Sequence, residues 1–455
     1  MDPIKECFQK VCEQARLDGA EAELLISSGE NISLKYSQKR LEKFESSQTQ
    51  MAGFRVIREG SQGYAYTENL SSEALMLCYR EALNNAKTLQ SSSSQAQIPL
   101  VTPDSSGVLA KNLGVLGGLL LKEEISMADK IEVARRLEED CLTFDSRVQS
   151  VPYGGFNESV SRRRILNSKG LDQEFAQSYY TGYAYPLAKQ GEASKMNGDS
   201  FFERKFQDIK VKATAQSAVE KTVALLGAVK LKTGNYSVVI ARDEFRSVVG
   251  MFEDYFSAKE VFEQKSLLAG KLGEQIASPK FQLIDDPMNM AGTGVRPFDA
   301  EGAYSRKTVL FENGIVKNYL TNLEYAQKMN LPHTAHAARG PSSQMNISPS
   351  NLVVGLGQKS LAELVSAKGQ VVFVTHFAGS LHSGFKESTG DFSIPAEGLL
   401  YENGQCIGPV DQFVLSGNVL ELLRDIEDLG NEYSKSPGSI LCPDVLVKSL
   451  SVAGA

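Results

Sequence analysis

The strongest local signal in this chain is an Asn-Gly turn that occurs twice between apolar runs. One turn, Asn313-Gly314, lies within residues 308–319, and the other, Asn403-Gly404, lies within residues 398–410. Asn-Gly tolerates the positive φ angles of a tight hairpin, so an apolar run on each side predicts two antiparallel strands. Apart from helical segments, the second half of the chain is therefore expected to be mostly β-structure.

The first 90 residues predict antiparallel strands accompanied by helices. Asp2 is placed to cap a helix that ends at Gly19, because its side chain can accept from the first free N–H groups. Apolar runs at 22–26 and 32–36 are separated by Ser28-Gly29-Glu30, which predicts a turn between two strands. A second strand pair at 53–57 and 63–66 and an amphipathic helix at 72–89 complete this part.

A change in composition marks the next segment. Residues 90–107 are rich in Ser, Gln and Pro without apolar periodicity, as in a surface linker. Helices are expected at 126–141 and 211–226, with strand-like sequence at 148–206. The pattern predicts an α+β protein of two domains. Residues 1–226 would form an N-terminal antiparallel sheet with helices, and residues 227–455 a β-rich domain with a curved or barrel-like antiparallel sheet.

A strongly amphipathic segment follows a predicted strand at 236–240. Asp243 is a candidate N-cap, and the apolar residues after it recur at i, i+3, i+4, i+7 and i+11. These residues are Phe245, Val248, Val249, Phe252 and Phe256. The segment is therefore expected to be a helix with one face packed into the core.

Composition excludes some classes of function. A formal net charge of −7 disfavours a nucleic-acid surface, and the single basic run, Arg162-Arg163-Arg164, is expected to lie on a solvated strand face. The longest apolar run, 113–121, is far shorter than the ~20 residues that span a bilayer, so no membrane segment is expected.

The cysteines and the N-terminus predict a cytoplasmic location. The six cysteines form no Cys-x-x-Cys pair, and no charged-then-apolar signal opens the chain. Buried, reduced thiols are therefore expected, and none has the local cationic setting of a nucleophile. No Gly-x-Ser-x-Gly elbow is present either.

Histidine is scarce for a zinc enzyme. The chain has four histidines, and none belongs to a His-Glu-x-x-His or His-x-x-Glu-His motif. One alternative is a relocated metal site made from His333, His336 and His376 with Asp285 or Asp286. We prefer the interpretation that these histidines lie at the surface or pack within a loop and bind no metal.

The segment from Gly292 to Asp299 resembles a phosphate loop but does not fulfil its requirements. It lacks the Gly-Lys-Ser/Thr ending, and Pro297 opposes a helix in the usual register. Arg296 and Asp299 could fix this loop as a charge-assisted pair, or Arg296 could hold a peptide carbonyl. These two residues are our candidates for substrate binding.

Several ordered motifs resemble the TldD/PmbA family, also called the modulators of DNA gyrase. They extend over nearly the whole chain and include Lys265 to Pro279, Asp285-Asp286-Pro287, Gly292-Thr293-Gly294, Arg296 to Gly302, Thr389 to Ser393 and Ser416-Gly417-Asn418. In this family, TldD-like members carry His-Glu-x-x-x-His on the helix predicted above and bind zinc. The other branch, PmbA or TldE, lacks that motif and pairs with TldD.

The resemblance implies that this chain has lost the zinc motif. The two histidine positions correspond to Arg246 and Met251, and the glutamate position corresponds to Ser247. No catalytic residue and no metal ligand are therefore carried over to this chain. Cys442 does not match the cysteine that completes the TldD site.

The resemblance favours one function and leaves two alternatives open. The chain is expected to be the catalytically inactive PmbA/TldE subunit of a cytoplasmic TldD-TldE zinc protease, which acts on unfolded or extended peptides. No cofactor is expected in it, and zinc is expected in a TldD-like partner. The alternatives are a homodimeric binding or regulatory protein that acts without TldD, and an independent hydrolase with the relocated metal site.

Overall fold

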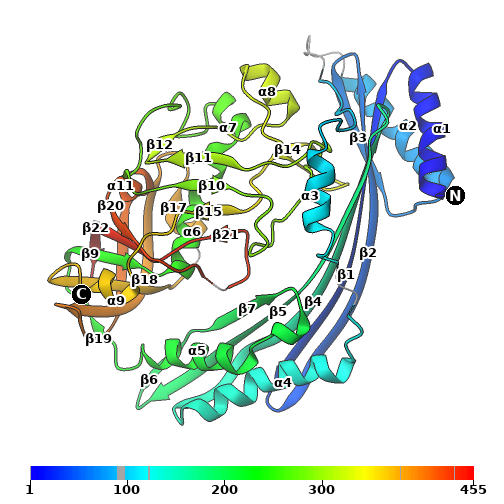
Figure 1. Cartoon of the computed structure of the whole chain (residues 1–455). Helices are drawn as coiled ribbons and strands as arrows, with labels where there is room; N and C mark the ends of the chain where they lie inside the picture. The colour runs from blue at the N-terminus through cyan, green and yellow to red at the C-terminus, as the bar shows by residue number, and fades with distance from the viewer. Residues whose placement is uncertain (1, 90–97, 121–122, 380, 435, 455) are drawn as a thin grey trace.

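The computed structural model describes residues 2–89, 98–120, 123–379, 381–434 and 436–454. Its most extended feature is a curved antiparallel sheet whose long strands pass along one side of the C-terminal half (Figure 1). Its strands are β1 (Glu21–Ser37), β2 (Arg40–Arg58), β3 (Ser61–Thr67), β4 (Val148–Asn167), β5 (Asp172–Gln190), β6 (Ala193–Met196) and β7 (Asp199–Glu203). Their order is β3-β2-β1-β4-β5-β6, and β7 also pairs with β5.

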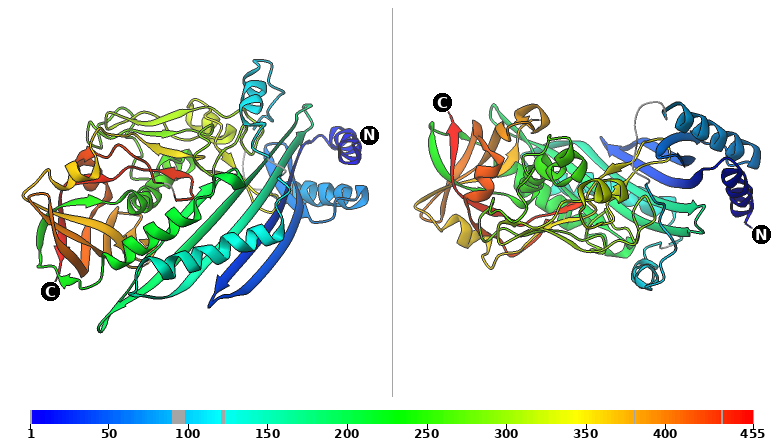
Figure 2. Two further views of the ribbon diagram at one scale, coloured as in Figure 1. Left: turned by 60° about the horizontal axis from the view of Figure 1, so that its bottom comes forward. Right: turned by 90° about the horizontal axis from the view of Figure 1, so that it is seen from above.

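Two groups of helices cover this sheet. The helices are α1 (Pro3–Leu17), α2 (Ser72–Leu89), α3 (Val108–Leu116), α4 (Met127–Phe144) and α5 (Val211–Val223). Helices α1 and α2 share a core with the β2–β3 end of the sheet, whereas α4 and α5 share a core with β4 and β5. Figure 2 shows α4 and α5 side by side along the long strands. The N-cap role of Asp2 is confirmed, since its carboxylate accepts from Ile4 N at 3.0 Å.

The predicted turn at Ser28-Gly29-Glu30 is wrong. Strand β1 is continuous through it, because Gly29 pairs with Thr49 of β2 on one side and with Ser161 of β4 on the other. Because neighbouring strands form hydrogen bonds with both edges of β1, its backbone N–H and C=O groups are paired in the extended conformation. These hydrogen bonds override the local preference for a turn. In the expected linker, 90–97 lie outside the described residues, and 98–107 contain no helix or strand.

The C-terminal half contains a closed barrel, which agrees with the expected barrel-like sheet. Strands β9 (Gly234–Ile240), β16 (Gln370–Phe377), β18 (Asp391–Glu402), β19 (Gln405–Asn418) and β22 (Val445–Ala453) form a ring, because β18 pairs with both β16 and β19. This sheet is mixed rather than wholly antiparallel, because β9 runs parallel to β16. Strands β8 (Val229–Lys230), β17 (Phe385–Lys386) and β20 (Ile426–Leu429) extend it. The protein is thus α+β with a barrel-like second half.

A second sheet packs beside the barrel. It contains β10 (Leu283–Asp285), β11 (Thr308–Glu312), β12 (Ile315–Val316), β15 (Leu352–Val354) and β21 (Ile440–Leu441), and a short hairpin joins β13 (Ala337–Ala338) to β14 (Asn346–Ile347). The helices of this half are α6 (Arg242–Phe252), α7 (Ala258–Phe262), α8 (Leu323–Met329), α9 (Leu361–Val365), α10 (Leu381–Gly384) and α11 (Val419–Arg424). Single-turn 3-10 helices lie at Phe206–Asp208 and Glu253–Phe256.

Both Asn-Gly hairpins are confirmed. Asn313 and Gly314 join β11 to β12 with φ angles of 51° and 76°, and Asn403 and Gly404 join β18 to β19 with φ angles of 49° and 79°. Positive φ at both central residues is the geometry that Asn-Gly permits.

The cysteine prediction is confirmed only in part. Cys7, Cys78, Cys141 and Cys442 are buried and unpaired, but Cys12 is half-buried and Cys406 is exposed on β19. Within the described ranges, no helix is long and apolar enough to cross a membrane.

Candidate functional site

A cavity of about 910 Å³ lies between the long sheet and helix α6. Strands β5 and β7 form one wall, and α6 with the chain before β21 forms the other. The lining residues include Thr181, Gly182, Tyr183, Tyr185, Ser200, Asp243, Glu244, Arg246, Ser247, Gly250, Met251, Glu253, Pro437 and Gly438. The wall of the cavity is therefore built from segments far apart in the sequence.

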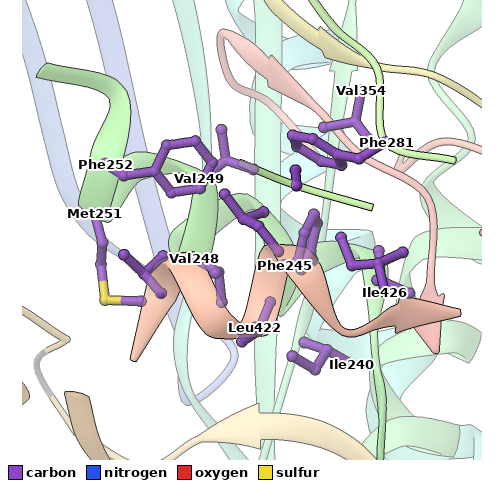
Figure 3. Close-up of a cluster of buried hydrophobic side chains, with 14 of the residues drawn as sticks. Ile240, Phe245, Val248, Val249, Met251, Phe252, Phe281, Val354, Leu422 and Ile426 are labelled. Carbon is purple, nitrogen blue, oxygen red and sulfur yellow. The ribbon is translucent and has the colours of Figure 1, made fainter. Parts of the chain in front are cut away.

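Helix α6 is held in place by its apolar face. Phe245, Val248, Val249 and Phe252 are buried, and they share one core with barrel and second-sheet residues (Figure 3). The predicted helical stripe is thus confirmed, and Phe256 extends it into the following 3-10 turn. Burying a large apolar side chain stabilises a fold by about 1.5–3 kcal/mol, so this face fixes the opposite face toward the cavity.

The expected N-cap role of Asp243 is wrong. Helix α6 begins at Arg242 after Ala241, so Asp243 lies within its first turn. Its carboxylate instead accepts from Ser434 Oγ and, at 3.1 Å, from Lys221 Nζ of α5. Burial opposes its charge, but Lys221 and these hydrogen bonds hold the pKa of Asp243 below its ordinary value. Lys221 Nζ also donates to Asp199 of β7 at 3.2 Å, so this lysine connects Asp243 to the sheet wall of the cavity.

The three residues that the resemblance places at the zinc-motif positions line this cavity. Arg246, Ser247 and Met251 lie on its α6 wall. The Arg246 guanidinium is turned onto the chain before β21, where Nη2 donates to Pro437 O at 2.6 Å and Nη1 to Ser436 O at 3.3 Å. Arg246 thus fixes the segment at Ser436 and Pro437 against helix α6.

These residues do not fit a zinc ion. Protease zinc is held by imidazole nitrogens, carboxylates or thiolates, and this surface offers a guanidinium, a hydroxyl and a thioether. The positive charge of Arg246 opposes a cation at the same place. Cys442 is fully buried, and burial raises the pKa of its thiol well above the usual value, although the charge of Arg246 acts in the opposite direction. A buried neutral thiol is a poor metal ligand.

The cavity also carries acidic groups. Burial, together with the charge of Asp254, raises the pKa of Glu253 to about 7. Glu244 accepts from Phe377 N at 3.0 Å and lies 3.7 Å from His376 Nδ1. The interaction with the Glu244 carboxylate raises the pKa of His376. The cavity is therefore polar, with several carboxyl groups along its α6 wall.

Arg296 and Asp299 lie elsewhere and form no ion pair with each other among the described residues. Arg296 Nη2 donates to Ser348 O at 3.1 Å. Asp299 is fully buried and accepts from the N–H groups of Glu301, Ala303 and Ala337. Asp299 therefore fixes the loop through backbone N–H groups, and the substrate-binding role expected for Arg296 and Asp299 stays a prediction.

The histidines considered for a relocated metal site are not brought together. His336 Nε2 contacts Asp285 Oδ1 at 2.9 Å in the core, His376 lies beside α6, and His333 lies 3.9 Å from Glu301. Among the described residues, one triad of potential ligands does form, and it consists of Asp299, Glu301 and His333. Its carboxylates already accept from backbone N–H groups and from Arg55, so it is better explained as part of an ion-pair network.

Sequence reasoning missed that network. Arg55 of β2 lies between Glu23 at 3.0 Å and Glu301 at 3.1 Å, and Glu23 also accepts from Arg339 at 2.9 Å. All four side chains are at most 1% exposed. The Arg55–Glu301 and Glu23–Arg339 contacts span 246 and 316 residues, so no local pattern could have signalled them.

Comparison with known proteins identifies the family. Models of domain 1, the central domain and the C-terminal domain of the PmbA/TldA metallopeptidases match residues 22–86, 121–226 and 233–454. The chain belongs to this metallopeptidase family. It is 25% identical to the metalloprotease PmbA of Escherichia coli O157:H7 over 443 residues, which cover 96% of this chain and 92% of that protein.

Solved structures share the fold over the full length. A Thermotoga maritima protein, named for modulation of a DNA gyrase, has a TM-score of 0.87 and 26% identity, with 99% of this chain and 100% of that chain covered. TldE of Thermococcus kodakarensis has a TM-score of 0.85 and 21% identity, with 98% and 100% covered, and supports the fold alone. The PmbA/TldA family thus combines a metallopeptidase description with the architecture found here.

Proposed function

We propose that this chain is the non-catalytic subunit of a cytoplasmic zinc protease, and that it helps to hold an extended peptide for a TldD-like partner. One observation carries the proposal. Arg246 lies on the cavity wall at a position where a zinc-binding relative needs histidine, and it is fastened to the Ser436 and Pro437 carbonyls. The scaffold around the site is intact, so the loss of ligands changes the role of the cavity rather than its shape.

The cavity offers a plausible place for a peptide backbone. Ser200 of β7 and Thr181 and Gly182 of β5 line it. Among the described strands, β7 pairs with β5 alone, so its other edge presents backbone donors and acceptors. An extended peptide can add to such an edge through main-chain hydrogen bonds, a mode that tolerates many sequences. Tyr183 and Tyr185 add aromatic surface for its side chains.

A second unpaired edge could receive the partner. Strand β3 pairs with β2 only from Ala52 to Arg58, so the segment 40–51 is bonded to β1 alone among the described strands. Its side chains are largely exposed, and they include Phe44 at 50%. An open strand edge is a template for pairing with another chain, here a TldD-like protein or a second copy.

The proposal is tested by co-purification and cleavage. The chain, a partner with the His-Glu-x-x-x-His motif, and their mixture are compared by light scattering and by hydrolysis of unfolded casein. We expect a complex of the two proteins, cleavage by that complex, its loss when a chelator removes zinc, and no cleavage by this chain alone. A partner whose motif glutamate is replaced by glutamine serves as the control.

Two outcomes overturn the proposal. Chelator-sensitive cleavage by this chain alone, abolished by His333→Ala, would establish the independent hydrolase. The absence of any complex, with partner activity unchanged by this chain, would leave the homodimeric binding protein.

A further inference from the structure

Three arginines line a pocket of about 530 Å³ where β4 meets the β13–β14 hairpin. Arg163 comes from β4, Arg296 from the loop after β10, and Arg339 from the residue that follows β13. The rest of the lining is uncharged and consists of Ala338, Gly340, Ser343, Gln344 and Asn346. No carboxylate belongs to the described lining, which gives the pocket one sign of charge.

The arginine side chains keep unused donors. The side chain of Arg339 is 0% exposed and donates Nη2 to Glu23, but its Nε and Nη1 have no hydrogen-bond partner in the described structure. Arg296 Nε is likewise buried and unpartnered there. A buried N–H group without an acceptor costs about 1–3 kcal/mol, and more when it is charged. The unused donors therefore indicate a missing acceptor.

Nearby carboxylates are committed to other partners. Asp299 accepts from three backbone N–H groups, and Asp285 accepts from His336 and Ser350. Glu23 is shared by Arg55 and Arg339. Burial and the charges of Arg296 and Arg339 accordingly lower the pKa of Arg163 to about 10. The three arginines thus line one pocket whose described lining contains no carboxylate.

The walls of the pocket are held rigidly. Arg163 Nη2 donates to Arg339 O at 2.7 Å, and Gly340 N donates to Ser343 Oγ at 2.8 Å. Pro341 packs onto β2 so closely that a Cβ atom added at Gly53 would lie 1.9 Å from its carbonyl oxygen. A site whose groups are already ordered loses less entropy on binding.

We propose that this pocket binds an oxyanion. Guanidinium groups form paired hydrogen bonds with carboxylate and phosphate oxygens, and Ser343, Gln344 and Asn346 could add neutral ones. The same chemistry could come from free phosphate or from the carboxylate end of a peptide. The inference is independent of the proposed protease partnership, because it concerns this chain alone.

Calorimetric titration of the full chain at constant ionic strength tests the site. The probes are inorganic phosphate, N-acetyl-trialanine as the free acid, and the same peptide as its amide. Saturable binding of phosphate or of the free acid is expected, with none for the amide. The probe that binds identifies the source of the oxyanion. Replacing a charge-assisted donor, as in Arg296→Gln or Arg163→Gln, should weaken that binding by about tenfold or more.

Arg204→Gln is the matched control. Arg204 is also a half-buried arginine bound to backbone carbonyls, those of Met290 and Gly292, but it lies outside the pocket lining. It should leave binding unchanged, and thermal unfolding should show that all three variants are folded. The proposal is overturned if the wild-type chain binds neither anion saturably, if the amide binds as well as the acid, or if Arg204→Gln weakens binding equally.

Discussion

The Arg246 guanidinium fills the space that a side chain at Gly438 would need. A Cβ atom added at Gly438 would lie 1.9 Å from Arg246 Nη2, while that nitrogen donates to the neighbouring Pro437 carbonyl at 2.6 Å. Helix α6 and the chain before β21 are thus fitted to each other through one side chain. This fit explains how a charged side chain is accommodated between α6 and this segment.

Gly438→Ala should therefore destabilise the protein through Arg246. Breaking the two carbonyl contacts is expected to cost about 1–3 kcal/mol in the free energy of unfolding, measured with urea. In an Arg246→Ala background the same change should cost much less, because the obstructing group is gone. Gly114→Ala, at a helical position with nothing within 4 Å, should be close to neutral. Equal costs of Gly438→Ala in both backgrounds would refute the coupling.

Tyr183 and Tyr185 should contribute to peptide affinity. Both line the cavity, with ring centroids 6.2 Å apart, and Tyr185 is 39% exposed. Replacing either by alanine should weaken binding of an unfolded peptide about 5- to 10-fold, as judged by fluorescence anisotropy of the complex. Tyr66→Ala, at an exposed tyrosine outside this cavity, should have no effect. An equal effect at Tyr66 would argue against the cavity as the peptide site.

Glu253 should make stability depend on pH. Its pKa rises from 4.5 to about 7 on folding, so the folded protein holds this proton more tightly than the unfolded chain does. The contribution is full below pH 4.5 and is lost as pH rises toward 7. Glu253→Gln should therefore raise the free energy of unfolding relative to wild type by an amount that grows from near zero at pH 4.5 to about 1–3 kcal/mol above pH 7, after allowance for partial exposure.

The exposed neighbour Asp254 provides the control for that effect. Asp254→Asn removes the negative charge that is the second cause of the raised Glu253 pKa. It should therefore increase the free energy of unfolding above pH 7 by less than Glu253→Gln does. Parallel stability curves for wild type and Glu253→Gln across this pH range would contradict the assignment.

The buried Glu23 should be essential for stability. Glu23→Gln leaves the Arg55 and Arg339 guanidinium groups without their shared carboxylate, and unpairing a buried charge costs about 3–5 kcal/mol. The exposed carboxylate Glu45, which pairs with Lys43, offers a comparison, and Glu45→Gln should cost less than about 1 kcal/mol. Similar unfolding free energies for the two variants would refute a structural role for the network.

Local patterns predicted those elements whose signal lies within one segment. The stripe from Phe245 to Phe252 follows the helical period, and Asn403-Gly404 has the φ angles of a hairpin, so neither depends on distant contacts. The turn expected near Gly29 failed because strands β2 and β4, far along the chain, bond both edges of β1 there.

The candidate site shows the same difference between features set within one segment and contacts between distant segments. The positions of Arg246, Ser247 and Met251 came from motif order, and the structure places all three on one cavity wall. Arg296 and Asp299 are close in sequence but have different partners, since Arg296 donates to Ser348 O, whereas Asp299 accepts from its own loop and from Ala337 N. The Glu23–Arg339 contact spans 316 residues and depends on how the sheet meets the second half of the chain.

The zinc content of the purified chain tests the central claim most directly. After dialysis against zinc and then against metal-free buffer, elemental analysis should find far less than one zinc ion per chain, because Arg246, Ser247 and Met251 are not the imidazole, carboxylate or thiolate ligands that hold protease zinc. One tightly bound zinc ion per chain, lost in His333→Ala or Met251→Ala, would contradict the account.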